Sequence, residues 1–182
     1  MRIIVGLGNP GEQYTQTRHN VAWLYLDYLL GDVKWSENKK WSALVYEQGG
    51  CLYIKPLSFM NSSGEVIRKV LDYYKLIPKR FGLLPKKEAD LKDVLTVIHD
   101  DLDIDFGTVK ETSDSSSAGH RGVQSTINIL KTQKFHRLRI GIKNKELRQP
   151  IPSEKFVLQK FKPDEKNQLP NIFSKINIEI IK

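Results

Sequence analysis

Residues 1–11 read MRIIVGLGNPG, and this opening stretch decides the fold. The apolar run at 3–7 is typical of a buried strand, and the GNPG sequence at 8–11 is typical of a turn. In open α/β sheets, ligands bind at the loops that follow the carboxyl ends of strands. The loop after residue 7 is therefore the first place where we expect a functional site.

Downstream of this turn, residues 17–20 read TRHN and precede an apolar stretch with helical spacing. His19 lies between a cation, Arg18, and an amide, Asn20. Histidine changes its charge near neutral pH, so this setting at the mouth of a sheet favours an acid–base role. We take His19 as the candidate acid–base group.

A competing interpretation comes from Gly6, Gly8 and Gly11, which satisfy the GxGxxG pattern of dinucleotide-binding loops. That pattern requires a helix to begin at once, so that its N-terminus meets the pyrophosphate. Residues 12–18 are instead polar apart from Tyr14, and no strand ending in an acidic residue follows at the required distance of about 20 residues. Nucleotide binding is therefore the weaker alternative.

The length and composition limit the class of protein. A chain of 182 residues has the size of one domain, and we expect residues 1–182 to form a single domain. The sequence shows no signal peptide and no apolar run long enough to span a membrane. Cys51 is the one cysteine, which excludes an internal disulfide and fits a reducing compartment. We expect a cytoplasmic protein without membrane contact, with Cys51 buried.

The net charge of +8 is concentrated in one segment. Residues 131–162 carry ten Lys or Arg against two Glu, a local excess equal to that of the whole chain. Such a local excess is typical of a surface that binds a polyanion, although a merely solvated surface would look the same.

The rest of the pattern alternates strands with helices. Strands are expected at 3–7, 43–46, 51–54, 94–98, 107–111 and 138–142. Helices are expected at 19–30, 61–74, 123–130 and from 163 onward. Residues 77–93, rich in Pro, Gly and charge, are expected to form a surface excursion. The alternation predicts an α/β fold with a mixed, twisted β-sheet flanked by α-helices.

Three further segments carry polar side chains at strand ends or helix starts. Residues 58–61 read SFMN, Asp100 follows the strand at 94–98, and residues 119–122 read GHRG. Strand ends that are far apart in the sequence meet at one edge of an α/β sheet. We therefore expect one site that contains Asn9, His19, Asn61, Asp100 and Arg121.

The chemistry of such a site follows from its residue types. If Asp100 accepts a hydrogen bond from one nitrogen of His19, the other nitrogen can take a proton from water. Asparagine amides can donate to a developing oxyanion. No serine or cysteine lies in a nucleophile motif, so attack by an activated water is the simpler hypothesis.

Seven segments, which follow one another along the chain, together resemble one family, and the match runs from residue 3 to about residue 161. They are VGLGNPG (5–11), Tyr14, TRHN (17–20), FMNSSG (59–64), HDDLD (99–103), AGH (118–120) and FHRLRIGI (135–142). The set is similar to the bacterial-type peptidyl-tRNA hydrolases. The resemblance implies a monomer without metal or cofactor that hydrolyses the ester between a peptide and the 3′ ribose of tRNA.

The resemblance also implies roles for individual residues. His19 would be the base and Asp100 its orienting partner. Asn9 and Asn61 would hold the 3′ end, the peptide backbone or the oxyanion. Tyr14 and Met60 would line the cleft, and Asn20 would support this substrate site. The other residues expected to bind the substrate are Phe59, His120 and Arg121. Arg139, helped by Lys110, would hold the 5′-phosphate end of the tRNA, a task that suits the planar guanidinium fork.

The sequence departs from the family pattern in four places. Arg121 stands where the family usually has asparagine, and an arginine cannot accept a hydrogen bond. Residues 115–117 are serines where glycines are common, residues 77–93 look longer than usual, and a chain ending at Lys182 predicts a shortened helical lid. These departures bear on rate and substrate contacts more than on the fold.

Two alternatives stay open at this level. The first is an RNA-binding relative that has lost catalysis, as in organellar splicing factors; Arg121 keeps it open, while His19, Asp100, Asn9 and Asn61 argue against it. The second is a nucleotide-dependent enzyme that uses Gly6, Gly8 and Gly11, which the polar residues after Gly11 disfavour. Residues 100–105, which carry four Asp, also have the composition of a cation site. In an extended strand Asp100 points away from the other three, so an orienting carboxylate followed by a capped turn is preferred.

Overall fold

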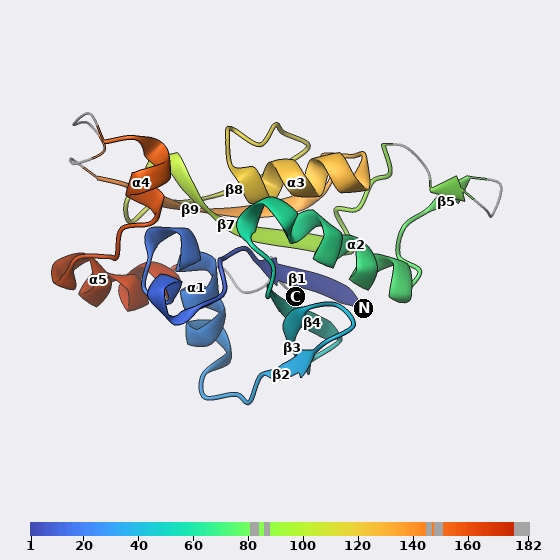
Figure 1. Ribbon diagram of the computed structural model, residues 1–182, viewed down its shortest axis with the longest axis horizontal. Helices are drawn as coiled ribbons and strands as arrows, with labels where there is room; N and C mark the ends of the chain where they lie inside the picture. Colours follow the sequence, from blue (N-terminus) through green and yellow to red (C-terminus); the bar gives the residue numbers. More distant parts are fainter. Residues whose placement is uncertain (81–83, 86–87, 145–146, 148–150, 177–182) are drawn as a thin grey trace.

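The structure, a computed structural model, describes residues 1–80, 84–85, 88–144, 147 and 151–176. A seven-stranded mixed sheet forms its centre (Figure 1). In spatial order its strands are β2 (Ser36–Asn38), β3 (Ala43–Gln48), β4 (Cys51–Pro56), β1 (Arg2–Gly6), β7 (Leu95–Asp105), β9 (His136–Lys143) and β8 (Val109–Ser113). The four central strands run parallel, while β3 and β8 pair antiparallel with their inner neighbours and β2 pairs antiparallel with β3. A separate pair of short antiparallel strands consists of β5 (Lys79–Arg80) and β6 (Leu84–Pro85).

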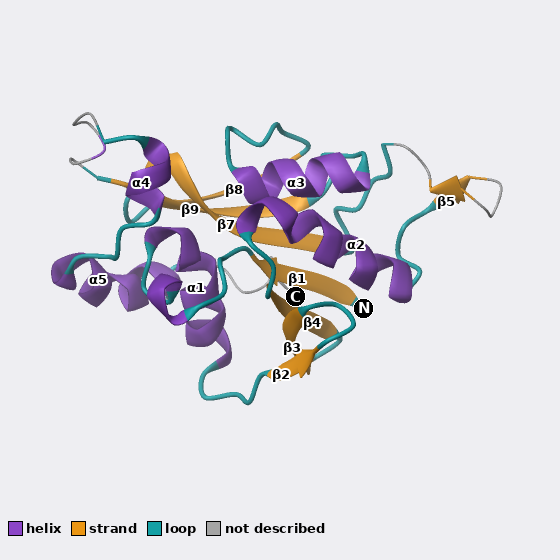
Figure 2. Ribbon diagram, viewed as in Figure 1, coloured by secondary structure: helices purple, strands orange, loops and turns teal. Residues whose placement is uncertain are grey.

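Helices cover both faces of the sheet (Figure 2). They are α1 (Val21–Leu30), α2 (Ser63–Tyr73), α3 (Arg121–Leu130), α4 (Ser153–Val157) and α5 (Pro163–Phe173). Three short 3₁₀ turns, η1 (Glu12–Tyr14), η2 (Arg18–Asn20) and η3 (Met60–Ser62), lie in the loops that follow β1 and β4. The α/β fold with a mixed sheet and flanking helices is thereby confirmed.

The alternation of side chains along β1 explains the two helical layers. Ile3, Val5 and Leu7 point into a core shared with α2 and α3, whereas Ile4 points into a second core shared with α1 and α5. Successive side chains of a strand face opposite sides of its sheet. A wholly apolar strand therefore requires cover on both faces, which the helices supply.

Two glycines allow close approach of elements at the carboxyl edge of the sheet. A Cβ on Gly8 would lie 2.6 Å from Nε1 of Trp23, whose N–H donates to the carbonyl of Gly6. A Cβ on Gly64 would lie 2.4 Å from the carbonyl oxygen of Ser125. These contacts press α1 against the first turn and α2 against α3.

The structure corrects several details of the predicted elements. The helix expected at 19–30 begins as the 3₁₀ turn η2 and continues as α1 from Val21. The long helix therefore does not start at the glycines, as a dinucleotide fold would need. The strand expected at 94–98 runs on to Asp105, because β9 keeps pairing with it through an irregularity in register. Asp100 consequently lies inside a strand, and the capped turn expected after it is wrong.

Residues 77–93 are not entirely a surface excursion. Ala89 and Leu91 are buried in the core beside α2 and α3, while 81–83 and 86–87 lie outside the described residues. Cys51 is buried, as expected. Within the described residues, no helix combines the length and the apolar character needed to cross a bilayer.

Candidate active site

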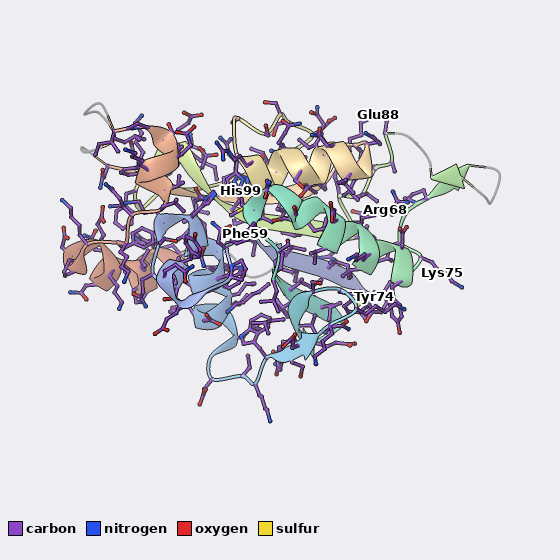
Figure 3. The ribbon with its side chains drawn as sticks, viewed as in Figure 1. Phe59, Arg68, Tyr74, Lys75, Glu88 and His99 are labelled. Carbon is purple, nitrogen blue, oxygen red and sulfur yellow. The ribbon has the colours of Figure 1, made fainter. Side chains whose placement is uncertain are left out.

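The strands β1, β4 and β7 run in the same direction, and a cavity of about 640 Å³ opens where β1 and β4 end beside the middle of β7. Most of the side chains singled out from the sequence line it, namely Asn9, Tyr14, His19, Phe59, Met60, Asn61, Asp100, His120 and Arg121. Figure 3 shows Phe59 and His99 on the side of the molecule where α2 begins, with Tyr74 and Lys75 where α2 ends. The expected convergence of strand ends is therefore present.

His19 and Asp100 meet at the floor of the cavity. Nδ1 of His19 lies 2.7 Å from Oδ1 of Asp100, across 81 residues of sequence. Both side chains are buried, although His19 keeps a small exposed surface on the cavity. Because a carboxylate can only accept, Nδ1 carries the proton and donates it. Nε2 of His19 is then left as the basic nitrogen.

His120 approaches the same carboxylate oxygen from α3. Its Nε2 lies 3.0 Å from Oδ1 of Asp100, and its Nδ1 accepts hydrogen bonds from the amides of Gly122 and Val123 at 3.1 and 3.2 Å. A nitrogen that accepts from amides carries no proton, so Nε2–H of His120 is the donor to Asp100. His120 thus caps α3 and contacts Asp100, and it also lines the cavity where the resemblance led us to expect a substrate contact.

The electrostatics of this cluster keep Asp100 ionised. Burial alone would raise the pKa of Asp100, but the neighbouring His19 and His120 hold the pKa of this carboxyl well below its ordinary value. His99 is also buried, and its Nδ1–H donates to the backbone carbonyl of Asp100 at 2.7 Å. Burial, together with the nearby His120, lowers the pKa of His99, which leaves that ring neutral.

Asn9 is oriented by hydrogen bonds on both sides. Its Oδ1 accepts from the amide of Met60 at 2.9 Å, so its NH₂ group is turned toward the cavity. The side chain of Asn20 holds the backbone of Asn9 through two hydrogen bonds of 2.9 Å. Its oxygen accepts from the amide of Asn9, and its NH₂ group donates to the carbonyl of Asn9. Asn20 does not line the cavity, so its contribution there is to position Asn9.

His19, Asp100 and His120 also have the identity of metal ligands, and their ligand atoms lie within 4.8 Å of one another. The hydrogen bonds of these side chains nevertheless disfavour the binding of a metal ion. His120 uses its Nδ1 lone pair on the α3 cap, so its Nε2 is protonated and has no electron pair for a metal. The three side chains therefore form a hydrogen-bonded network centred on the carboxylate of Asp100.

One wall of the cavity comes from residues that sequence reasoning missed. The short helix α4 and its flanks supply Ile151, Ser153, Glu154, Val157 and Leu158. A signal for this helix exists in Pro152 at its N-cap and an acid in its first turn. Across the mouth of the cavity, Nη2 of Arg121 lies 3.5 Å from Oε1 of Glu154.

The expectation that Arg18 lies as a cation at the mouth is wrong. Its side chain is fully buried and its Nη2 lies 2.7 Å from Oε2 of Glu165 on α5. The guanidinium also packs over the rings of Phe156 and Phe161. Arg18 joins the loop before His19 to the C-terminal helices.

The residues expected to bind phosphate are not among those that line the cavity, and they come from the last two strands of the sheet, β9 and β8. Lys110 on β8 and Arg139 on β9 are directly opposite each other in the antiparallel pair. Nε of Arg139 lies 2.7 Å from Oδ2 of Asp101. Arg137, counted in the basic segment, is buried and donates to the carbonyls of Ser115 and Ser116, so it is not part of an exposed basic face.

The comparison with known proteins agrees with this geometry. Residues 3–181 match the family model described as peptidyl-tRNA hydrolase. The chain belongs to the peptidyl-tRNA hydrolase family. This membership covers nearly the whole sequence, including all the cavity residues named above.

Individual members of the family are clearly similar to the chain. The peptidyl-tRNA hydrolase of Mycoplasma capricolum is 39% identical over 179 residues, which are 96% of this chain and 88% of that protein. That of Gloeobacter violaceus is 38% identical over 178 residues, or 94% and 82% of the two chains. The solved peptidyl-tRNA hydrolase structure from Acinetobacter baumannii has a TM-score of 0.77 at 25% identity, with 100% and 89% coverage.

Proposed function

We propose that this chain hydrolyses the ester bond that joins a peptide to the 3′ ribose of tRNA, releasing the peptide and free tRNA for use in translation. Family membership supports the reaction. The observation that carries the mechanism is the 2.7 Å contact between Nδ1 of His19 and Oδ1 of Asp100 at a cavity floor. We also propose a single-domain, cytoplasmic monomer that acts without a metal or cofactor.

The reaction begins with a water bound beside Nε2 of His19. As the water oxygen attacks the ester carbonyl carbon, His19 takes a proton from it, and Asp100 stabilises the resulting imidazolium. The carbonyl becomes a tetrahedral intermediate with a negatively charged oxygen. When this intermediate collapses, the bond to the 3′ oxygen breaks and His19 returns its proton to that oxygen. The products are a tRNA 3′-hydroxyl and a peptide carboxyl group.

The oriented amide of Asn9 is the donor best placed for the developing oxyanion. Its NH₂ group faces the cavity because its oxygen is held by the Met60 amide. Asn61, exposed at the rim, supplies a second amide for the substrate. Phe59 and Tyr14 offer ring surfaces to the terminal base or to peptide side chains. Arg139 and Lys110 form the phosphate contact at the sheet edge.

An assay with N-acetyl-aminoacyl-tRNA tests this function. The protein is incubated with the substrate, with and without a chelator, and release of the blocked amino acid is followed. We expect turnover that survives the chelator and falls by about 10²–10⁴-fold in His19→Ala, the usual contribution of a general base. Tight tRNA binding without any turnover would contradict the proposal and point to an RNA-binding relative without catalysis.

A further inference from the structure

The ion pair between Arg121 and Glu154 spans the entrance to the catalytic cavity. Arg121 is the first residue of α3 and Glu154 the second residue of α4, and both line the cavity that contains His19. Their side chains are 68% and 66% exposed, and the closest nitrogen and oxygen are 3.5 Å apart. This is longer than the separation of about 2.7–2.9 Å in a strong charge-assisted hydrogen bond. The pair is therefore weak and easily exchanged.

The backbones that carry the two charges are nevertheless held firmly. His120, next to Arg121, caps α3 and binds Asp100. In α4, Phe156 is fully buried beneath the guanidinium of Arg18. The positions of the two charged side chains across the mouth thus follow from the packing of α3 and α4. A guanidinium with several unused donors remains at the entrance whenever Glu154 moves aside.

We infer that the carboxylate of Glu154 pairs with Arg121 in the free protein at the place where a phosphate of the RNA end binds. Substrate entry then exchanges the carboxylate for the phosphate. This inference rests on the proposed function, because it assumes that an RNA 3′ end enters this cavity. The guanidinium fork binds phosphate oxygens in pairs, which is better geometry than the present contact with Glu154. Glu154 is then a specificity-determining residue that weakens the binding of RNA until the exchange occurs.

The exchange has a direct consequence for a charge-removing substitution. Glu154→Gln keeps the shape of the side chain but removes the charge that competes with phosphate for Arg121. We expect deacylated tRNA to bind about two- to fivefold more tightly, the range of an exposed ion pair. For N-acetyl-aminoacyl-tRNA, the gain appears in KM rather than kcat. The effect shrinks with added salt, since these charges are exposed.

Glu47→Gln is the matched control. It removes the same charge from an exposed glutamate on β3, at the far side of the sheet, and is expected to leave tRNA binding unchanged. The gain from Glu154→Gln is also expected to vanish when Arg121→Gln is introduced, and for an N-acetyl-aminoacyl ester of adenosine, which has no phosphate.

The inference is overturned if Glu154→Gln leaves tRNA binding unchanged, or if the gain persists with Arg121→Gln or with the adenosine ester. A persistent gain would show a general charge effect or a contact with another part of the substrate. Binding of deacylated tRNA does not require catalysis, so this result is separate from the proposed function. Absence of wild-type turnover would contradict the proposed reaction. A gain in tRNA affinity that depends on Arg121 would still support the phosphate exchange.

Discussion

Arg18 and His19 are neighbours in the chain, yet each is held by an acidic partner from a different part of the molecule. Arg18 turns toward α5 and meets Glu165, whereas His19 turns toward β7 and meets Asp100. Both contacts measure 2.7 Å and both are buried. The two pairs therefore have the same contact distance and similar burial, but their surroundings differ.

The surroundings of Arg18 are closed. Glu165 also accepts hydrogen bonds from the backbone amide of Lys162 and from Asn144, and two aromatic rings cover the guanidinium. The surroundings of His19 are open on one side, because its ring lines the cavity. A buried charged pair enclosed on all sides fixes the position of an element. A buried pair with one open side has a basic nitrogen available for chemistry.

The largest expected effect comes from breaking the closed pair. Arg18→Met leaves Glu165 buried without its countercharge, which lowers the free energy of unfolding by about 3–5 kcal/mol. Chemical denaturation measures this change. Arg68→Met is the control, because Arg68 pairs with Asp72 on the exposed surface of α2 and contributes only about 0.3–0.5 kcal/mol. A loss no larger in Arg18→Met than in Arg68→Met would contradict a structural role for the closed pair.

Breaking the open pair of His19 and Asp100 is expected to lower the catalytic activity. Asp100→Asn keeps an oxygen that can accept from His19 and His120 but removes the charge that stabilises the imidazolium. We expect kcat to fall by about 100-fold or more, equivalent to about 2.7 kcal/mol in the barrier. Steady-state hydrolysis of N-acetyl-aminoacyl-tRNA measures it. If Asp100→Asn retained near wild-type turnover, His19 would not need the carboxylate.

Low pH is expected to change the difference in stability between the wild type and Arg18→Met. Burial alone would raise the pKa of Glu165, but hydrogen bonds from Arg18 and its neighbours bring this pKa below the ordinary 4.5. A lowered pKa contributes stability above the ordinary pKa, and this contribution is lost as pH falls through the folded-state value. Without Arg18 the pKa of Glu165 is no longer lowered in this way.

The stability difference between the two proteins should therefore narrow as the pH falls from the pKa of Glu165 in Arg18→Met toward its lower pKa in the wild type. Denaturation midpoints from pH 7 to pH 3 measure it, and the contribution of Asp100 cancels because both proteins contain it. A difference that stays constant over this range would show that Arg18 does not control the ionisation of Glu165.

The smallest expected effect lies at the sheet edge. Arg139→Ala should reduce the salt dependence of tRNA binding by roughly one phosphate contact. Lys39→Ala, an exposed lysine near the opposite edge of the sheet, should leave the slope unchanged. Binding isotherms at several salt concentrations measure both. If the salt dependence of tRNA binding were unchanged in Arg139→Ala, Arg139 would not contact the tRNA.

The comparison also explains what could be predicted from the sequence. The meeting of Asn9, His19 and Asp100 was predicted because parallel strands bring their carboxyl ends to one edge, although Asp100 lies inside β7, which runs on beyond the end of β1. The destination of Arg18 depends on Glu165, 147 residues away, and no local pattern identifies that partner. The hydrogen bond from His120 to Asp100 could not be predicted, since it depends on how the α3 cap orients the ring. The α4 wall was missed because a helix of five residues is too short for a periodic signal.

The central claim is that His19 and Asp100 act as one unit on a single water. A double-mutant cycle on the turnover of N-acetyl-aminoacyl-tRNA tests it most directly, using His19→Ala, Asp100→Asn and the double variant. We predict that Asp100→Asn causes its large loss only while His19 is present, so that the double variant is as active as His19→Ala alone. Losses that multiply in the double variant would show that the carboxylate acts independently of the imidazole, which would contradict the account.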